Sequence, residues 1–279
     1  MSFKIVLDSC GELLEEWKYD DRMESVPLTL MVEDETIIDD ETFDQKAFLA
    51  KVAASPTYPR SACPSPERYR QAFDCEADHV YAVTLSAELS GSYNSAVLGK
   101  NLLEEEQGKR KIHVFNSRSA SIGETLIAIR IRQCEEQGME FEKIVQTVEK
   151  YIDSMNTYFV LESLDALRKN GRLTGVKAIV ATALKIKPIM GSTDIGSICQ
   201  LGQARGMNRA LQKMLDFIVE RTADSQNRIL AISNCNCRER AMMLKAAVEE
   251  RLNPVKVIVL DTAGVSSLYA SDGGIIVAV

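Results

Sequence analysis

Four short polar turns carry the groups in this sequence that are best suited to chemistry. The turns are rich in hydroxyl side chains and lie at residues 8–9, 61–65, 86–92 and 116–121. Serine hydroxyls and backbone N–H groups donate hydrogen bonds, and such donors can together hold a carboxylate or a phosphate. The turns therefore indicate a binding site for an anionic head group.

The turn at 86–92 is the strongest of the four candidates. It follows an apolar run at 79–85 that is typical of a buried strand, and a helix is predicted from Ser92 onward. A helix start presents unpaired N–H groups and a partial positive charge, which favour an anion. The hydroxyls of Ser90, Ser92 and Ser95 could add donors. From the residues alone a simpler interpretation stays open, in which Ser90 only caps the helix.

Catalysis by serine is the alternative use of these hydroxyls, as in a small-molecule hydrolase or phosphotransferase. A serine nucleophile needs a neighbouring base, and the two histidines, His79 and His113, would lie within strands rather than at turns. The sequence lacks a Gly-x-Ser-x-Gly elbow, a dinucleotide glycine fingerprint and a Walker A loop. The acidic pair Asp39-Asp40 falls in a stretch that we expect to be exposed. We therefore expect binding rather than catalysis.

The elements that must position these turns alternate between strand and helix over the first half of the chain. Short links join them, and this pattern predicts a mostly parallel sheet with helices on both faces. Ligands bind such sheets at the carboxyl ends of the strands. From about residue 157 the pattern mixes hairpins and crossovers. The sequence thus predicts an α/β domain over 1–156 and a smaller α+β domain over 157–279.

The stretch between the first two turns is strongly acidic, and we expect most of it to be exposed. Residues 12–24 are predicted to form a solvated helix or loop, and 33–42 a small exposed hairpin. Between them, 26–32 is predicted to form one strand with Pro27 near its start. Thr42 is a suitable cap for the helix that follows.

Composition excludes several classes of partner. The 279 residues include 40 acidic and 33 basic ones, giving a net charge of -7. An acidic surface disfavours nucleic acid and a standing attachment to an anionic membrane. No apolar run reaches the length of about 20 residues that a transmembrane helix needs, so no stable membrane insertion is expected. No signal peptide is visible, and we expect a cytoplasmic location.

Seven cysteines are scattered along the chain, and in a reducing compartment we expect them to be free thiols. Cys235 and Cys237 are the one close pair. They have no second pair to match them, and neither histidine is near them in sequence. We therefore expect no metal site, and no cofactor, among these residues.

Several stretches, taken in order, give the sequence a resemblance to a known family. The segment TLSAELSGSYNSA at 84–96 resembles the strand–turn–helix signature of the DegV family of fatty-acid-binding proteins. Further similar stretches are FKIVLDSC at 3–10, SVPLTLMV at 25–32, PRSACPSP at 59–66, FNSRSASIG at 115–123, LRKNGRLT at 167–174, LKIKPI at 184–189 and LGQARGMNRAL at 201–211. The resemblance runs from about residue 3 to about residue 260 and implies a two-domain, DegV-like fold.

The resemblance implies that two hydroxyls bind the carboxylate of a long-chain fatty acid. They are Ser61, at a position where threonine is common in the family, and Ser90 of the Leu-Ser-Gly turn. From the residues alone, Ser61 could instead make a local turn bond. The family's C-terminal turn carries a histidine that can reach the carboxylate, and Ser271 stands there in this chain, followed by Asp272. Ser271 is a third candidate, and this departure leaves a different head group open.

The acyl chain and the partner surface have candidates of their own. The helix that carries Ile122 and Leu126, with Ile127 and Ile129, could line a tunnel, as could the apolar stretch 178–186. The same apolar stripe is equally typical of ordinary core. The resemblance implies that Arg172 and Arg205 lie near the ligand entrance and the surface that meets a partner.

The resemblance also implies a role as the carrier subunit that presents a fatty acid to a fatty acid kinase. Burial of each CH₂ group is worth about 0.8 kcal/mol, so a sixteen-carbon chain would gain on the order of 12 kcal/mol of binding free energy before ordering costs. On this hypothesis the protein has no catalysis of its own. A ligand-sensing module without a kinase partner stays open as a further alternative.

Overall fold

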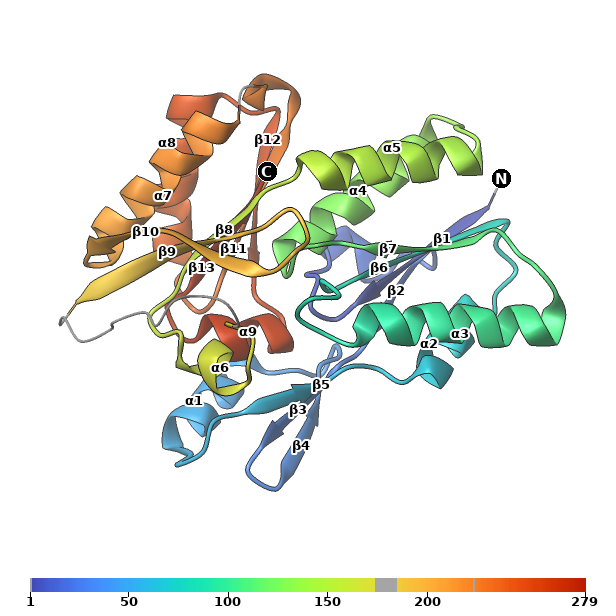
Figure 1. Cartoon of the computed structure of the whole chain (residues 1–279), viewed down its shortest axis with the longest axis horizontal. Coiled ribbons are helices and arrows are strands. Elements are labelled where there is room, and N and C mark those ends of the chain that lie inside the picture. Colours follow the sequence, from blue (N-terminus) through green and yellow to red (C-terminus); the bar gives the residue numbers. More distant parts are fainter. Residues whose placement is uncertain (1, 174–184, 223) are drawn as a thin grey trace.

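The computed structural model describes residues 2–173, 185–222 and 224–279. Two sheets lie side by side in it, one in each half of the chain (Figure 1). The sheet of the first half has the order β2-β1-β6-β7, and all of its strand pairs are parallel. Its strands are β1 (Phe3–Asp8), β2 (Met23–Val26), β6 (His79–Thr84) and β7 (Ile112–Asn116). We call it the parallel sheet.

Helices cover both faces of the parallel sheet (Figure 1). They are α4 (Ile122–Glu136) and α5 (Phe141–Ser154) on one face, and α2 (Pro66–Phe73) and α3 (Ser92–Gln107) on the other. Successive side chains of a strand point to opposite faces. In β6, Tyr81 and Val83 pack with α4 and α5, whereas Val80 and Ala82 pack with α2 and α3. This two-sided burial explains why the strand is a continuous apolar run.

The second half forms a six-stranded mixed sheet in the order β10-β9-β8-β13-β11-β12. Its strands are β8 (Thr157–Val160), β9 (Ile186–Ser192), β10 (Ile198–Arg205), β11 (Ile229–Asn234), β12 (Lys256–Asp261) and β13 (Ile275–Ala278). Strands β11 and β12 pair in parallel, and the other pairs are antiparallel. Helices α7 (Met207–Arg221) and α8 (Arg238–Leu252) pack on one face of this sheet.

Helix α4 joins the two halves, because it also packs on the other face of the mixed sheet (Figure 1). Its residues Ile122 and Leu126 are buried in one apolar cluster with Phe159 of β8 and Ile276 of β13. The opposite side of the same helix packs on the parallel sheet through Ile127. The two halves therefore share a helix as well as a boundary.

A third, small sheet lies below the boundary between the halves (Figure 1). Its order is β4-β3-β5, and the strands are β3 (Thr29–Val32), β4 (Glu35–Ile38) and β5 (Arg60–Ala62). The short helices around it are α1 (Gln45–Ala54), α6 (Asp165–Lys169) and α9 (Gly264–Ala270). Strand β5 places Ser61 opposite Leu30 of β3.

The expected fold class is confirmed. The first half is an α/β layer structure with a parallel sheet, and the second half is a mixed α+β arrangement. Among the described residues, none of the helices is both long enough and apolar enough to span a membrane.

The expectation of one strand over 26–32 is wrong. The chain forms β2 up to Val26 and β3 from Thr29, and the two strands belong to different sheets. Pro27 has no backbone N–H to donate to a neighbouring strand, so strand pairing stops there. The next residue, Leu28, donates its N–H to the hydroxyl of Ser9 instead, at 2.9 Å.

The hairpin at 33–38 is exposed as expected, but three side chains within the two acidic stretches are not. Glu12, Trp17 and Asp39 are all buried, at 3 % exposure each. Thr42 does not cap helix α1, because its hydroxyl donates to Asp40 at 2.6 Å. Asp44 is the cap, and its carboxylate accepts the N–H of Ala47 at 3.0 Å. The local composition predicted exposure to solvent for these side chains, but elements far away in the sequence bury them.

Candidate functional site

A cavity of about 800 Å³, part of it open to solvent, lies between the two halves of the chain. The turns after the parallel strands line one side, and β8, β9, β10, β13 and α9 line the other. Its apolar lining includes Leu85, Leu89, Phe159, Leu161, Leu167, Ile198, Val265 and Ile276.

Ser61, Ser90 and Arg172, the candidates for the carboxylate site and its entrance, all line this cavity. The hydroxyl of Ser61 lies 3.0 Å from the hydroxyl of Tyr269. The guanidinium of Arg172 sits 5.9 Å from the centre of the Tyr269 ring and donates to the carbonyl of Leu89 at 3.2 Å. Arg172 thus connects Tyr269, the partner of Ser61, to the turn that carries Ser90.

Ser90 is held at the start of helix α3 with its hydroxyl oxygen already occupied. That oxygen accepts the N–H of Ser92 at 3.2 Å and lies 3.1 Å from the hydroxyl oxygen of Ser92. The residue at the cap position is Gly91, which has no side chain to cap the helix. Ser90 therefore serves the helix start, and its O–H can still donate into the cavity.

Ser271 does not line the cavity, whereas its neighbours Tyr269 and Ala270 do. Ser271 ends helix α9 with a φ of 58°, and its N–H donates to the carbonyl of Ser267 at 3.0 Å. The sequence reasoning missed Tyr269, whose hydroxyl meets Ser61. The C-terminal turn, where the family has its histidine, does reach the cavity. It does so through Tyr269, two positions before Ser271.

Buried Asp39 fixes the start of α9. Its carboxylate accepts the backbone N–H groups of Gly264 and Val265 at 2.6 and 2.8 Å, and the hydroxyl of Ser9 at 2.9 Å. Burial raises the pKa of Asp39 to about 6, against the opposing effect of these hydrogen bonds. A residue expected in an exposed loop therefore positions the helix that carries Tyr269.

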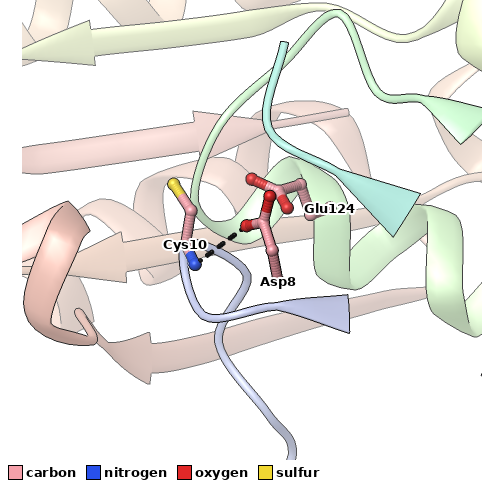
Figure 2. Close-up of side chains that lie close together, drawn as sticks. All are labelled: Asp8, Cys10 and Glu124. Carbon is pink, nitrogen blue, oxygen red and sulfur yellow. Dashed lines mark hydrogen bonds between the residues drawn. The ribbon is translucent and has the colours of Figure 1, made fainter. Parts of the chain in front are cut away.

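The polar floor of the cavity is built at the carboxyl end of β1. Asp8 accepts the N–H of Leu85 at 2.8 Å and that of Cys10 at 3.1 Å, and Figure 2 shows the second of these bonds. The Cys10 sulfur accepts the N–H of Ser121 at 3.3 Å, and both residues line the cavity. Burial raises the pKa of the Cys10 thiol well above its usual value. Cys10 is therefore a protonated thiol in the cavity wall and a poor nucleophile.

Glu12 lies beside this floor and accepts the hydroxyl of Ser121 at 2.6 Å. Burial raises the pKa of Glu12 to about 7. Ser121 has a φ of 57°, in the left-handed region that non-glycine residues rarely adopt. Such strain costs on the order of 1–3 kcal/mol and is found most often at functional sites.

The hairpin between β9 and β10 closes one side of the cavity. Its Gly196 carbonyl accepts the hydroxyl of Ser86 at 2.9 Å, and its Ser197 hydroxyl donates to Glu88 at 3.1 Å. Gly196 has a φ of 89°, and a Cβ there would lie 2.7 Å from the Cα of Arg118. The tip of the hairpin can approach the first half this closely only with glycine at 196.

The family of the chain follows from its full-length match to one family model. The model of the DegV family matches residues 2–279. The chain belongs to the DegV family. The expected resemblance is thereby confirmed over the whole length of the chain.

Individual DegV proteins support the same grouping. A DegV domain-containing protein of Streptococcus gordonii is 32% identical over 278 residues, covering 99% of this chain and 98% of that protein. The crystal structure of a DegV-family protein from Ruminococcus gnavus, refined with vaccenic acid, is 54% identical, has a TM-score of 0.98 and covers 100% of both chains. The Streptococcus pneumoniae fatty acid kinase B3 protein, loaded with linoleic acid, is 30% identical with a TM-score of 0.90, over 100% of this chain and 99% of that one.

The remaining candidates of this DegV protein lie away from the cavity lining. Ile122 and Leu126 are buried core between α4 and the mixed sheet. Arg205 is exposed at the end of β10. Of the apolar stretch 178–186, residues 178–184 lie outside the described residues. Side chains that the sequence did not single out, such as Phe159, Leu161 and Ile276, supply the apolar wall.

Neither histidine can serve as a base for the cavity serines. His79 is buried against Glu135 at 2.7 Å, and His113 lies 3.3 Å from Glu149. Neither residue lines the cavity. The histidines of this DegV chain are therefore not placed to activate a cavity serine as a nucleophile.

The seven cysteines are all free, as expected. Cys237 donates to the carbonyl of Gly274, and Cys235 is buried near the carbonyl of Ser267. In the described part of the chain, one cluster has the spacing of metal ligands, and it consists of Asp8, Cys10 and Glu124. The sequence reasoning missed that cluster.

Proposed function

We propose that this DegV protein binds one long-chain fatty acid in the cavity between its halves and presents the carboxylate to a fatty acid kinase. The observation that carries this proposal is a single cavity with hydroxyl donors at one edge and apolar side chains along its walls. The R. gnavus relative with vaccenic acid supports the choice of ligand, and the fatty acid kinase B3 protein with linoleic acid supports the choice of partner.

In the proposed complex the hydroxyls of Ser61 and Ser90 donate to the carboxylate. Each such hydrogen bond to a charged group is worth roughly 1.5–3 kcal/mol. The hydroxyl of Tyr269 is close enough to Ser61 to join them. Ser271 would act through the turn that holds Tyr269, because it lies outside the cavity lining.

The proposed acyl chain runs along the apolar wall of the mixed sheet. Burial of its methylenes contributes on the order of 12 kcal/mol for sixteen carbons before ordering costs, at about 0.8 kcal/mol for each CH₂. This is about two to four times the contribution of the two head-group hydrogen bonds. The chain therefore supplies most of the affinity, and the hydroxyls fix which end faces the entrance.

The protein acts as a carrier in this proposal, and chemistry on the carboxylate belongs to the kinase. An acyl chain is poorly soluble in water and partitions into membranes, so a protein that shields it can deliver it in the cytoplasm. We propose residues 1–156 as the half that binds the head group and 157–279 as the half that covers the chain. Arg172, at the cavity, and Arg205, on the exposed end of β10, are the proposed cations of the entrance and the docking surface.

A titration tests the binding step. Protein stripped of lipid is titrated with oleate, with palmitate and with methyl oleate, which keeps the chain but loses the carboxylate. We expect tight binding of the two acids and clearly weaker binding of the ester. Equal affinity for the ester would remove the carboxylate site, and no binding of any of the three would overturn the proposal.

A coupled assay tests the carrier step. The loaded protein is mixed with ATP and the kinase subunit of a fatty acid kinase, and acyl phosphate is measured. We expect Arg205→Ala to bind oleate as the unaltered protein does but to form acyl phosphate more slowly, because Arg205 is exposed and outside the cavity. A loaded protein that supports no acyl phosphate formation would favour the sensing module instead.

A further inference from the structure

Two buried carboxyl groups face each other beneath the cavity floor. In the part of the chain that the structure describes, no cationic side chain lies between them. Asp8 ends strand β1 and Glu124 lies in the first turn of helix α4. Both side chains are completely buried, and their oxygens lie within 4.8 Å of one another and of the Cys10 sulfur. Figure 2 shows the two carboxyls pointing toward each other, with the Cys10 side chain beside them.

The hydrogen bonds of the two groups are unequal. Asp8 accepts two backbone N–H groups, which suits a carboxylate anion. In the described part of the chain, no N–H or O–H group donates to either oxygen of Glu124, only the weak thiol donor of Cys10 lies beside it, and neither carboxyl joins an ion pair. A buried carboxylate with no partner is strongly unfavourable. Glu124 therefore needs a proton, and Asp8 offers the acceptor for it.

We propose that Glu124 carries a proton in the folded protein and donates it to Asp8, and that this acid pair positions Ser92 and Ser90 at the head-group site. The second part rests on the proposed function. The first part is a property of the folded chain and holds with or without a ligand.

Electrostatics agree with the geometry. Burial, and then the charge of Asp8, raise the pKa of Glu124 well above its usual value. The hydrogen bond from Glu124 opposes the effect of burial on the pKa of Asp8. The other titratable groups that interact with Glu124 include Cys10 and Glu12, from the segment after β1, and Tyr69 of helix α2. Two carboxyls in close contact commonly share one proton in this way.

The link to the ligand site runs through Ser92. The Ser92 side chain is completely buried and lies close enough to Asp8 to lower the pKa of that carboxyl. Its hydroxyl oxygen lies 3.1 Å from that of Ser90, and its N–H donates to Ser90 at 3.2 Å. Asp8 also holds Leu85, the residue before the turn. Asp8 therefore holds the start of the turn that carries Ser90 and lies beside Ser92 at its other end.

A neutral Glu124 also lowers the electrostatic cost of binding an anion. Asp8 and Glu124 lie under a floor whose Cys10 lines the cavity. Two negative charges there would repel the carboxylate of a ligand, and one proton removes half of that charge.

A bound metal ion is the competing explanation of the cluster. The three residues would supply one ligand atom each, whereas a structural zinc site takes four protein ligands. Asp8 and the Cys10 sulfur already accept backbone N–H groups, which compete with a metal for the same atoms. The shared proton explains the cluster without further ligands.

Infrared difference spectroscopy of the full chain tests the proton directly. The spectrum of Glu124→Gln is subtracted from that of the unaltered protein at pH 8, without added fatty acid. We expect a carbonyl band of a protonated carboxylic acid that is present in the unaltered protein and missing from the variant. Absence of that band, or a stoichiometric metal ion found by elemental analysis of the purified protein, would overturn the proposal.

Two variants test the positioning role. Glu124→Leu removes the donor at similar volume, and Glu124→Gln restores a donor that cannot ionise. We expect Glu124→Leu to bind oleate about tenfold or more weakly and Glu124→Gln to recover most of that loss. If Glu124→Leu does not fold, the Gln variant decides: a loss of binding of tenfold or more in a folded Glu124→Gln would contradict the positioning role. A protein with the infrared band but no affinity for any fatty acid would leave the shared proton standing and refute the proposed function.

Discussion

The parallel sheet and the mixed sheet contribute to the same cavity in opposite ways. The parallel sheet offers the ends of its strands, where backbone N–H groups, hydroxyls and buried carboxyls gather around Asp8, Ser90 and Ser121. The mixed sheet offers side chains of its strand interiors, such as Phe159 and Ile276. The turns after the parallel strands bring Ser90 and Ser121 to the cavity, and the mixed sheet brings Phe159 and Ile276, so neither half alone would form this site for an amphipathic ligand.

The strand geometry explains this division. All strands of the parallel sheet point the same way, so their carboxyl ends and the turns after them gather at one edge. In the mixed sheet, alternate residues face opposite sides. Tyr158 of β8 packs with α7 and α8, whereas the next residue, Phe159, faces the cavity and α4.

The largest expected effect comes from placing a charge in the apolar wall. Ile198→Glu would put a carboxylate beside the acyl chain, where it must be desolvated when the ligand binds. We expect oleate affinity to fall roughly 100-fold or more, as measured by titration. Ile195→Glu is the matched control, because Ile195 lies on the same hairpin at 62% exposure and outside the cavity lining. Similar losses in the two variants would contradict the wall assignment.

Glu12, a buried carboxyl at the polar edge, should make the stability of the protein depend on pH. The pKa of Glu12 is raised to about 7 in the folded protein, so the folded state holds a proton that the unfolded state releases at lower pH. Protonated Glu12 stabilises the folded protein relative to the unfolded chain by on the order of 3 kcal/mol below about pH 4.5. This contribution is lost as the pH rises to about 7. We expect Glu12→Gln to raise the melting temperature at pH 8 and to make little difference at pH 4. A Gln variant that is less stable at pH 8 would contradict the buried position of Glu12.

Substitutions at the head-group site should lower the affinity for a fatty acid less than a charge in the apolar wall does. Ser90→Ala removes one hydrogen bond to a carboxylate, and we expect affinity for oleate to fall about 10- to 150-fold. Ser95→Ala, a few residues further along the same helix and outside the cavity lining, should bind as the unaltered protein does. Unchanged affinity of Ser90→Ala in the same titration would remove Ser90 from the site.

Ser61→Ala should have the smallest effect on binding of these substitutions. The Ser61 hydroxyl lies 3.0 Å from that of Tyr269, so Tyr269 can partly replace it as a donor. We expect a loss of affinity of about tenfold or less, recovered in Ser61→Thr, which keeps the hydroxyl. A loss in Ser61→Thr equal to that in Ser61→Ala would show that shape, and not the hydroxyl, matters at this position.

Much of the fold could be predicted because its signals are local. The run at 79–85 and the serine-rich turn after it identified β6, the start of α3 and the neighbourhood of Ser90. The break at Pro27 was missed because a β-like composition continues on both sides of it. Helix α9 was missed as well, since it has 7 residues and depends on Asp39, which is far away in the sequence.

The rest of the site could not be predicted because it arises from packing between distant segments. Glu124 lies in the first turn of a helix, where acidic residues are common on the surface, and only the approach of Asp8 shows that it is buried. The same holds for Tyr269, which meets Ser61 across the boundary between the halves. The apolar wall was indistinguishable from ordinary core, and the residues chosen for it, Ile122 and Leu126, are core.

Mass spectrometry of the purified protein is the decisive experiment, first under native conditions and then after organic extraction. If the two sheets together form a fatty-acid site, the native mass should exceed the mass of the chain by one long-chain fatty acid. The extract should contain that acid, and Ile198→Glu should yield much less of it than Ile195→Glu. A protein that carries no acyl chain, or that carries a ligand with a different head group, would contradict the proposed function.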